Sequence, residues 1–345
     1  DLAYINLNGL KSLDKRLLNV TFHNRLGSEY ERLHRIIEIS INVAKIIGAD
    51  VKDVKIASSL CKLDLVSEMV YEFPELQGVM GAYYATEAGF SKIVADSCIE
   101  HYWPKGPSDK VPKNLVSASV ALSDKIDLIS SFWAINEKPT GSKDPFALRR
   151  AAIGIVRILI EKEINVSLIS LLKLGNKGAN FEDLLGFIND RARGYLIEKG
   201  LRLDILNACF SEEYRVSLTD LYQRAKAIKV FVNIQSGTDL IQAYKRAVNI
   251  LNAEEKKDGV EYSFDPDEKL FKEEVEKVLY KQLDETDAEV EKYLKENNVQ
   301  SAMKELASLR QPIDSFFTSV QINSDNPIIR RNRLCLLNKI KLVMH

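Results

Sequence analysis

The chain has 345 residues and a formal net charge of −1; 46% of the residues are hydrophobic and 28% are charged. This composition is typical of a globular protein with a real core, and the length allows about two or three domains. No run approaches the roughly 20 apolar residues of a membrane-spanning helix, so we expect no membrane partner. The four cysteines are widely spaced, which argues against a zinc ribbon and favours a reducing, cytoplasmic location.

Charge is unevenly distributed along the chain. Residues 254–292 hold 15 acidic and 7 basic side chains, whereas residues 310–345 hold six Lys and Arg against two acids. A neutral chain with one basic end can bind phosphates locally. The alternative is a solvated basic helix without an anionic partner, and charge alone leaves both readings open.

The first part of the chain has apolar residues at helical spacing. One helix is expected to stop at Gly48, a natural C-terminal cap, and a second follows Asp53. Pro74 interrupts the pattern before the next helix. Three prolines and a glycine within 103–112 predict an irregular loop, and a further helix covers 116–130.

A distinctive helix is predicted from the middle of the chain. Asp144 and Pro145 should open it, because Asp is a favoured N-cap and Pro is favoured at the first helical position. Its apolar side would pack inward, while Arg150 and Arg157 lie together on another face. The segment 165–179 is expected to be a linker.

Helical patterns resume towards the C-terminus. Segments 220–232 and 239–251 are amphipathic, and in the second Lys245 and Arg246 face away from the apolar side. Further helical segments are expected within the acidic stretch, with a loop at 264–267, from 287 onward, and after Pro312 and Pro327. No alternating strand pattern of useful length occurs, so the fold class is predicted to be all-α.

Motifs of the common catalytic sites are absent. The sequence contains no P-loop, G-x-G-x-x-G, H-E-x-x-H or G-x-S-x-G pattern. Four histidines leave little room for a metal cage or a catalytic triad. We therefore predict no catalytic residue, no metal site and no cofactor within this chain.

Four segments, in order, resemble the glycyl-tRNA synthetase β subunit of the bacterial two-subunit type. The longest are K-L-D-L-V-S-E-M-V-Y-E-F-P-E-L-Q-G-V-M-G-A-Y-Y-A at 62–85 and T-G-S-K-D-P-F-A-L-R-R-A-A at 140–152. They are joined by R-Q-P-I-D-S-F-F at 310–317 with I-R-R-N-R-L at 329–334, and by the short F-H-N-R-L-G-S at 22–28. The resemblance identifies the chain as similar to the C-terminal half of that subunit.

The resemblance implies a role in attaching glycine to tRNA(Gly). In that family a separate α subunit binds glycine and ATP with Mg and forms the adenylate, while the β subunit grips tRNA. The implied partners are therefore tRNA(Gly) and the α subunit, in an assembly expected to hold two α and two β chains. The β chain of the family is about twice as long, so we interpret this sequence, which begins without Met, as part of a longer chain.

The resemblance also implies a domain order: a tail at 1–19, a helical domain like a degenerate HD phosphohydrolase at 20–164, a linker at 165–179 and an anticodon-binding-like helical domain at 180–345. HD enzymes hold metal through a His, a His-Asp dipeptide and a later Asp. Here His34 and Asp124 are candidates for the outer positions, with His101 in a nearby loop. The dipeptide position holds Cys61 and Lys62, and a lysine repels a dication. A metal-dependent phosphohydrolase remains the alternative function.

In the anticodon-binding-like domain, RNA contact is expected from donors and planar guanidinium groups near the C-terminus, because proteins usually read splayed RNA bases by stacking and base-edge hydrogen bonds. The candidates are Arg310, Asp314, Arg330, Asn332 and Arg333. Phe316, Phe317 and Val320 at helical spacing are interpreted as core residues rather than stacking platforms, and Asp314 has the alternative of a structural acid at a helix start.

Two further groups of cations are candidates for tRNA phosphates: Lys143, Arg149 and Arg150 in the 140–152 segment, and Lys245 with Arg246. The alternative for Arg149 or Arg150 is an ion pair inside the domain, with Asp127 or Asp144. A third reading of the whole chain is a helical scaffold that docks the α subunit without touching RNA.

Overall fold

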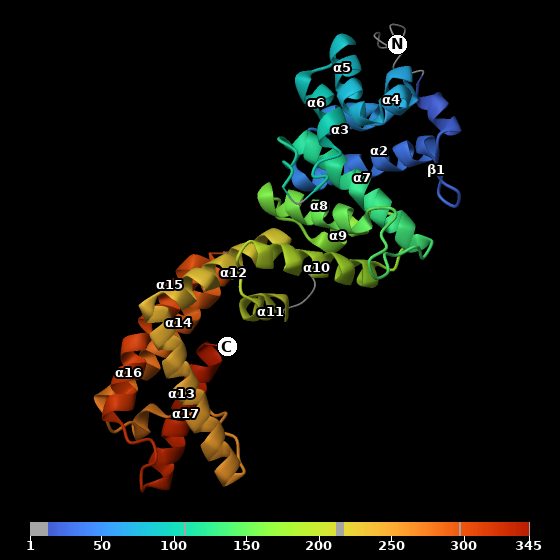
Figure 1. Cartoon of the computed structure of the whole chain (residues 1–345). Coiled ribbons are helices and arrows are strands. Elements are labelled where there is room, and N and C mark those ends of the chain that lie inside the picture. The colour runs from blue at the N-terminus through green and yellow to red at the C-terminus, as the bar shows by residue number, and fades with distance from the viewer. Residues whose placement is uncertain (1–12, 107, 212–216, 297, 345) are drawn as a thin grey trace. The chain divides into compact units, whose positions relative to one another are not determined.

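The computed structural model describes residues 13–106, 108–211, 217–296 and 298–344, and these fold into two compact units, 1–222 and 223–345. Figure 1 shows the helices that make up each unit. Both are built from helices, which confirms the all-α prediction. Within the described residues the one sheet is a hairpin of β1 (Thr21–His23) and β2 (Gly27–Ser28), which lies in the 22–28 segment.

The first unit contains a series of packed helices, joined by short turns and by longer segments such as residues 135–147. They are α2 (Glu29–Ile47), α3 (Val51–Leu60), α4 (Glu68–Glu72), α5 (Val79–Glu87), α6 (Lys92–Glu100), α7 (Leu115–Ala134), α8 (Leu148–Glu161), α9 (Leu168–Leu172), α10 (Phe181–Glu198) and α11 (Leu203–Ser211), with 3₁₀ turns η2 (Asp14–Asn19), η3 (Leu63–Val66) and η4 (Pro74–Leu76). Helix α12 (Leu218–Asn233) contains the boundary between the units.

The ends of α2 follow directly from its sequence. Ser28 and Glu31 form a reciprocal capping box at its start, and Gly48 ends it in the left-handed conformation at φ 75°. The predicted stop at Gly48 is therefore confirmed. The apolar face of α2 packs on α7, the most buried helix of the unit, and α7 also contacts α3, α6 and α8. The core of the first unit thus forms around α7.

The start of α8 differs from the prediction. The helix begins at Leu148, and Ala147 before it has a left-handed φ of 56° that breaks any helix from Pro145. Asp144 still satisfies the first helical amides, because its carboxylate accepts from the Leu148 N–H at 2.8 Å and the Arg149 N–H at 3.0 Å. Asp144 acts as a cap from outside the helix, so the predicted N-cap position was wrong by one turn.

The chain divides at a different place from the expected linker. Residues 165–179 include α9 and belong, together with α10, to the first unit. Trp133 on α7 donates to the Asp183 carboxylate at 2.6 Å, and Thr219 donates to the Leu159 and Ile164 carbonyls. These bonds tie the segment after 165 to α7 and α8, which is why the compact unit extends to residue 222.

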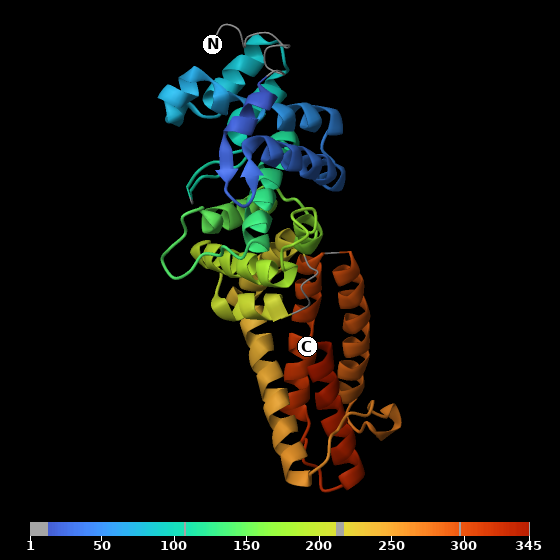
Figure 2. The same ribbon diagram turned by 90° about the vertical axis from the view of Figure 1, so that its right-hand side faces the viewer.

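The second unit is a bundle of helices that lie side by side along their length (Figure 2). They are α13 (Gln235–Asp258), α14 (Glu274–Lys295), α15 (Val299–Ser308), α16 (Arg310–Ser319) and α17 (Pro327–Val343), with the turn η5 (Glu268–Leu270). Helix α13 packs on α16 and α17, and α14 packs on α15, α16 and α17. Buried Leu240, Leu283, Phe316 and Leu337 come from four of these helices and share one core.

Among the described residues, no helix is both long and apolar enough to cross a bilayer.

The acidic stretch at 254–292 forms the end of α13, an irregular segment around Asp265 and most of α14. On the outward side of α14, Lys277, Lys292 and Lys295 pair with glutamates three or four residues away.

We predict opposite effects for two glycine substitutions. A Cβ at Gly237 would lie 2.0 Å from the Phe231 carbonyl oxygen, whereas a Cβ at Gly194 in α10 meets nothing within 4 Å. Gly237→Ala should destabilise the second unit by about 1–3 kcal/mol or more through overpacking. Gly194→Ala should stabilise the first by about 0.5–1 kcal/mol. Calorimetric unfolding of the two variants checks this, and equal effects would contradict the described packing.

Candidate nucleic-acid interface

An open groove runs between α13 and α16 in the second unit, with a volume of about 510 Å³. Arg246 on α13 places its guanidinium carbon 4.4 Å from the centroid of the Phe317 ring on α16. The remaining lining residues are Asn249, Ile250, Ala253, Glu254, Val320, Gln321, Ile322 and Asn323. An arginine stacked on a half-buried aromatic ring therefore forms one side of a groove rich in amide groups.

These groups match what a splayed nucleobase requires. A base stacks on an aromatic ring or on a guanidinium plane, and each such contact is worth about 1–3 kcal/mol. The amide of exposed Asn249 carries both donor and acceptor for a base edge, and the Arg246 charge suits a phosphate. The groove can hold a single-stranded base without any catalytic group.

The opposite side of α16 is less suited to an anion. Arg310 and Asp314 line a second groove of about 570 Å³ between α14 and α16. Arg310 lies 2.5 Å from the Asp239 carboxylate and 3.7 Å from that of Asp314, while half of its side chain stays exposed to solvent. One arginine is balanced there by two carboxylates, so this groove offers little net positive charge.

The 329–334 segment turns three of its polar side chains into the bundle. Arg330 pairs with Glu254 and Asp258 on α13, and hydrogen bonding to the Glu254 carboxylate, then to that of Asp258, raises the pKa of its guanidinium. Asn332 bonds the Asp267 backbone in both directions, at 2.8 and 3.0 Å. These residues fasten α17 to α13 and to the segment before α14.

Arg333 fastens α17 to α14. Its Nε lies 2.7 Å from a Glu276 oxygen, and one terminal nitrogen donates to the Gln321 carbonyl at 2.8 Å. Burial raises the pKa of Glu276, but the Arg333 hydrogen bond and the Glu273 and Lys272 amides outweigh it, so the net pKa is lowered. Arg330, Asn332 and Arg333 thus have internal partners, and RNA contact by them stays a prediction. Lys245 and Arg246, in contrast, are exposed as predicted.

In the first unit, residues 140–147 of the 140–152 segment form a tight loop, and residues 148–152 begin α8. Thr140 and Lys143 exchange backbone hydrogen bonds at 3.2 and 2.8 Å. The Arg149 guanidinium holds the loop in place by donating to the Gly141 carbonyl at 2.6 Å and to the Lys143 carbonyl at 3.4 Å. The side chains of Lys143 and Arg150 are exposed. Phosphate contact by Lys143, Arg149 and Arg150 stays a prediction.

Asp127 and Asp144, the ion-pair partners considered for Arg149 and Arg150, bind other groups in the structure. Asp127 pairs with Arg35 at 2.6 Å and with Arg32 at 3.6 Å. The Asp144 carboxylate receives backbone amides, including that of Arg149, rather than a guanidinium. Arg157 also turns inward, where it bonds the Glu161 carboxylate and the carbonyls of Gly106 and Asp109. Arg150 and Arg157 lie seven residues apart on α8 and share a side of the helix as predicted, but only Arg150 is exposed there.

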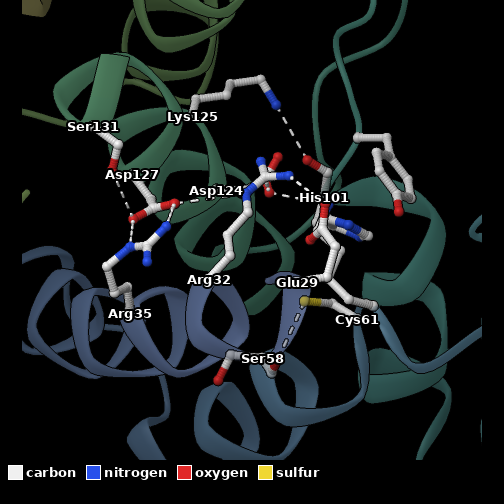
Figure 3. A network of polar contacts seen from close by, with 12 residues as sticks. Glu29, Arg32, Arg35, Ser58, Cys61, His101, Asp124, Lys125, Asp127 and Ser131 are labelled. Atoms are coloured by element: carbon white, nitrogen blue, oxygen red, sulfur yellow. Dashed lines mark hydrogen bonds and ion pairs between the residues drawn. The ribbon is translucent and has the colours of Figure 1, made fainter. Parts of the chain in front are cut away.

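Asp124 on α7 lies at the centre of a buried network (Figure 3). Arg32 reaches it at 2.9 Å and the Lys62 ammonium at 3.0 Å. Burial acts to raise the pKa of Asp124, but Lys62, then Arg32, dominate and lower it well below its usual range. His101 is fully buried beside this network, and burial followed by Lys62 lowers its pKa.

The side chains around Asp124 do not fit a metal ion. His34 is exposed and meets the Tyr30 ring edge to face, with ring centroids 4.4 Å apart, whereas Arg32 and Lys62 lie beside Asp124. Two cations already neutralise the carboxylate that a metal would need. In the described part of the chain, no three His, Cys, Asp or Glu side chains gather as a metal site.

Comparison with protein families identifies the class of each part. Residues 240–345, essentially the bundle of the second unit, match the DALR anticodon binding domain, and residues 6–211 match the model described as glycyl-tRNA synthetase beta subunit. The second match covers more than half of the chain. The chain belongs to the glycyl-tRNA synthetase β-subunit family.

Curated relatives agree with this assignment. The chain is 46% identical over 335 residues to the glycine–tRNA ligase beta subunit of Ruegeria sp. (strain TM1040), covering 97% of this chain and 49% of the relative. It is 46% identical over 333 residues to that of Paracoccus denitrificans (strain Pd 1222), covering 96% and 49%. The chain thus spans about half the length of the curated relatives it matches.

Sequence reasoning missed part of the groove. It grouped Phe317 with Phe316 and Val320 as core; the structure buries Phe316 and Val320 but leaves Phe317 half-buried beneath Arg246. Ile313, Phe316 and Val320 already complete the inward stripe at i, i+3 and i+7, so Phe317 is the one turned aside. The signal that finds the groove is Arg246 with Asn249, which share the polar face of α13.

We predict that Arg333 and Arg331 differ sharply in their effect on stability. Arg333→Ala leaves the buried Glu276 carboxylate without its cation and should cost about 3–5 kcal/mol. Arg331 is exposed, with its guanidinium 5.2 Å from the Phe264 ring, so Arg331→Ala should cost at most about 1 kcal/mol. Denaturant unfolding monitored in the second unit measures both.

The ion pair of Arg333 and Glu276 should also make the stability of the second unit depend on pH. Because the pKa of Glu276 is lowered on folding, its contribution is present above the unfolded value of 4.5 and is lost as the pH falls through the folded pKa. Glu276→Gln should flatten the loss of stability below pH 4.5. An unchanged pH profile would show that the pair does not stabilise the bundle.

Proposed function

We propose that this chain binds tRNA(Gly) as the tRNA-gripping part of a glycine–tRNA ligase. An α subunit, also part of the proposal, supplies the site where glycine, ATP and Mg react, in an assembly of two α and two β chains in the cytoplasm. The names of the relatives and the two family matches support this role. The chain itself contributes binding and orientation rather than a catalytic residue.

The observation that carries the proposal is the α13–α16 groove. It lies within the part that matches an anticodon-binding domain, and it combines a stacked guanidinium and ring with neighbouring amides. Single-stranded loop bases are the usual targets of such groups. An anticodon base stacked on the Arg246 guanidinium, which Phe317 supports from its other side, accounts for all of these features together.

A second contact is proposed in the first unit. Arg149 fixes the backbone of the 140–143 loop, and exposed Lys143 and Arg150 project from it. Two cations on a rigid support suit phosphates of a tRNA stem, where they would add affinity without reading bases.

The two rival functions have weaker support. A metal-dependent phosphohydrolase would need a ligand set that Lys62 and Arg32 displace at Asp124. A scaffold that never touches RNA gives no role to exposed Arg246 and its contact with the half-buried Phe317 ring. We therefore favour tRNA binding.

Substitutions in the groove should weaken tRNA(Gly) binding selectively. Phe317→Leu keeps an apolar side chain but removes the stacking ring, and the affinity should fall about 10-fold, in line with about 1–3 kcal/mol per stacked base. Arg246→Gln should have a similar effect. Lys281→Ala, a 77% exposed lysine on α14, is the matched control and should leave binding unchanged. Fluorescence anisotropy with labelled tRNA at fixed salt measures all three.

Loop substitutions should instead change the salt dependence. Lys143→Ala combined with Arg150→Ala should lower the slope of log affinity against log salt by about 1 to 2, because each lost phosphate contact removes about 0.7–0.9. Binding of unrelated tRNAs should fall equally. A slope identical to that of the unchanged protein would remove this loop from the proposal.

A further inference from the structure

The segment from α4 to α5 exposes large apolar side chains to an unusual degree. Tyr71 is 89% exposed, Tyr83 52%, Val79 46% and Phe73 42%. Val79 and Tyr83 lie four residues apart and share one side of α5. Single exposed apolar residues are ordinary, but four within 13 residues form a surface that usually has a partner.

This surface is held rigidly. The buried Asp64 carboxylate accepts from the Gly78 amide at 2.6 Å and the Gly81 amide at 3.1 Å, which fixes the turn into α5. Gly78 needs its positive φ of 86°, and a Cβ there would lie 2.8 Å from the Cys98 carbonyl oxygen. Gln77 donates to the Tyr102 hydroxyl at 2.6 Å. The exposed aromatics therefore stand on a fixed scaffold at one end of the first unit (Figure 1).

The segment that carries this surface is acidic along its sequence, and the first cation after it is exposed Lys92, at the start of α6. From Leu63 to Ser91 the sequence contains no Lys and no Arg, but it contains five acids. One of them, Asp64, is buried, and the other four are exposed: Glu68, Glu72, Glu75 and Glu87. Such a surface repels the phosphates of RNA and complements a basic protein surface.

We propose that the α4–α5 surface is where this chain docks its α subunit. It would receive an α-subunit face with an apolar centre and a rim of Lys and Arg, with Tyr71, Phe73, Val79 and Tyr83 buried on assembly. Aromatic residues at the centre and charges at the rim are the usual arrangement of a specific protein interface. This inference rests on the proposed function, which supplies the partner, and it separates the protein-binding surface from the tRNA-binding groove.

Two surface variants test the docking. Tyr71→Ser with Phe73→Ser removes apolar contact, and Glu72→Lys with Glu75→Lys reverses the rim charge. The matched controls are Ile328→Ser, at 61% exposure, and Glu274→Lys with Glu285→Lys on α14. All positions are exposed, so circular dichroism should show unchanged folding. Binding to the α subunit of the same organism is measured by calorimetric titration, and tRNA(Gly) affinity is measured in parallel.

The expected result is a loss of α-subunit affinity of at least 10-fold in both surface variants, with tRNA affinity unchanged and both controls normal. Unchanged α binding, or no α binding by the unaltered chain, overturns the proposal. A loss of self-association by sedimentation instead of α binding assigns the surface to a second copy and also overturns it. A loss of tRNA affinity alone assigns it to RNA. Failure of tRNA binding in the groove variants, by contrast, refutes the proposed function and not the docking.

Discussion

Arg333 and Glu276 set the constraint on which the second unit depends, because a carboxylate and a guanidinium buried in a bundle must face each other. The pair joins α17 to α14, while Arg330 joins α17 to α13 through Glu254 and Asp258. A buried pair of this kind adds little stability over an apolar substitute, but it is costly to break and so fixes the register of the helices. Helices α13 and α14, which these pairs join through α17, both pack on α16 and so position the helix that borders the groove.

In the first unit, too, buried carboxylates must be paired with cations. Asp124 and Asp127 on α7 require cations, and Arg32, Arg35 and Lys62 supply them from α2 and from the turn after α3. This organisation resembles an enzyme centre in its density of charge, but each carboxylate is already neutralised by a side chain. Buried cations are thereby distinguished from exposed ones, which include Lys143, Arg150 and Arg246.

The sequence predicts the helices well where local signals suffice. Gly48 ends α2, and Pro327 opens α17, because glycine and proline act through their own backbone geometry. The start of α8 escaped prediction because the left-handed Ala147 carries no local signal.

The roles of the arginines escaped prediction for a different reason. The partners of Arg333 and Arg330 lie 57 and 76 residues away along the chain, so no local pattern reveals that these side chains are occupied. The family resemblance drew attention to the 329–334 segment, and the structure shows that much of it fastens α17. The α13–α16 groove is lined by Arg246, which the sequence identified as a candidate, and by Phe317, which the sequence pattern assigned to the core.

The central claim is that an anticodon base lies between α13 and α16, and photo-crosslinking tests it most directly. tRNA(Gly) with a photoreactive pyrimidine in the anticodon would be irradiated with the protein, and the linked peptides identified by mass spectrometry. The account predicts crosslinks to peptides that contain Phe317 or Arg246. Crosslinks confined to the acidic side of α14, or to the first unit, would contradict it.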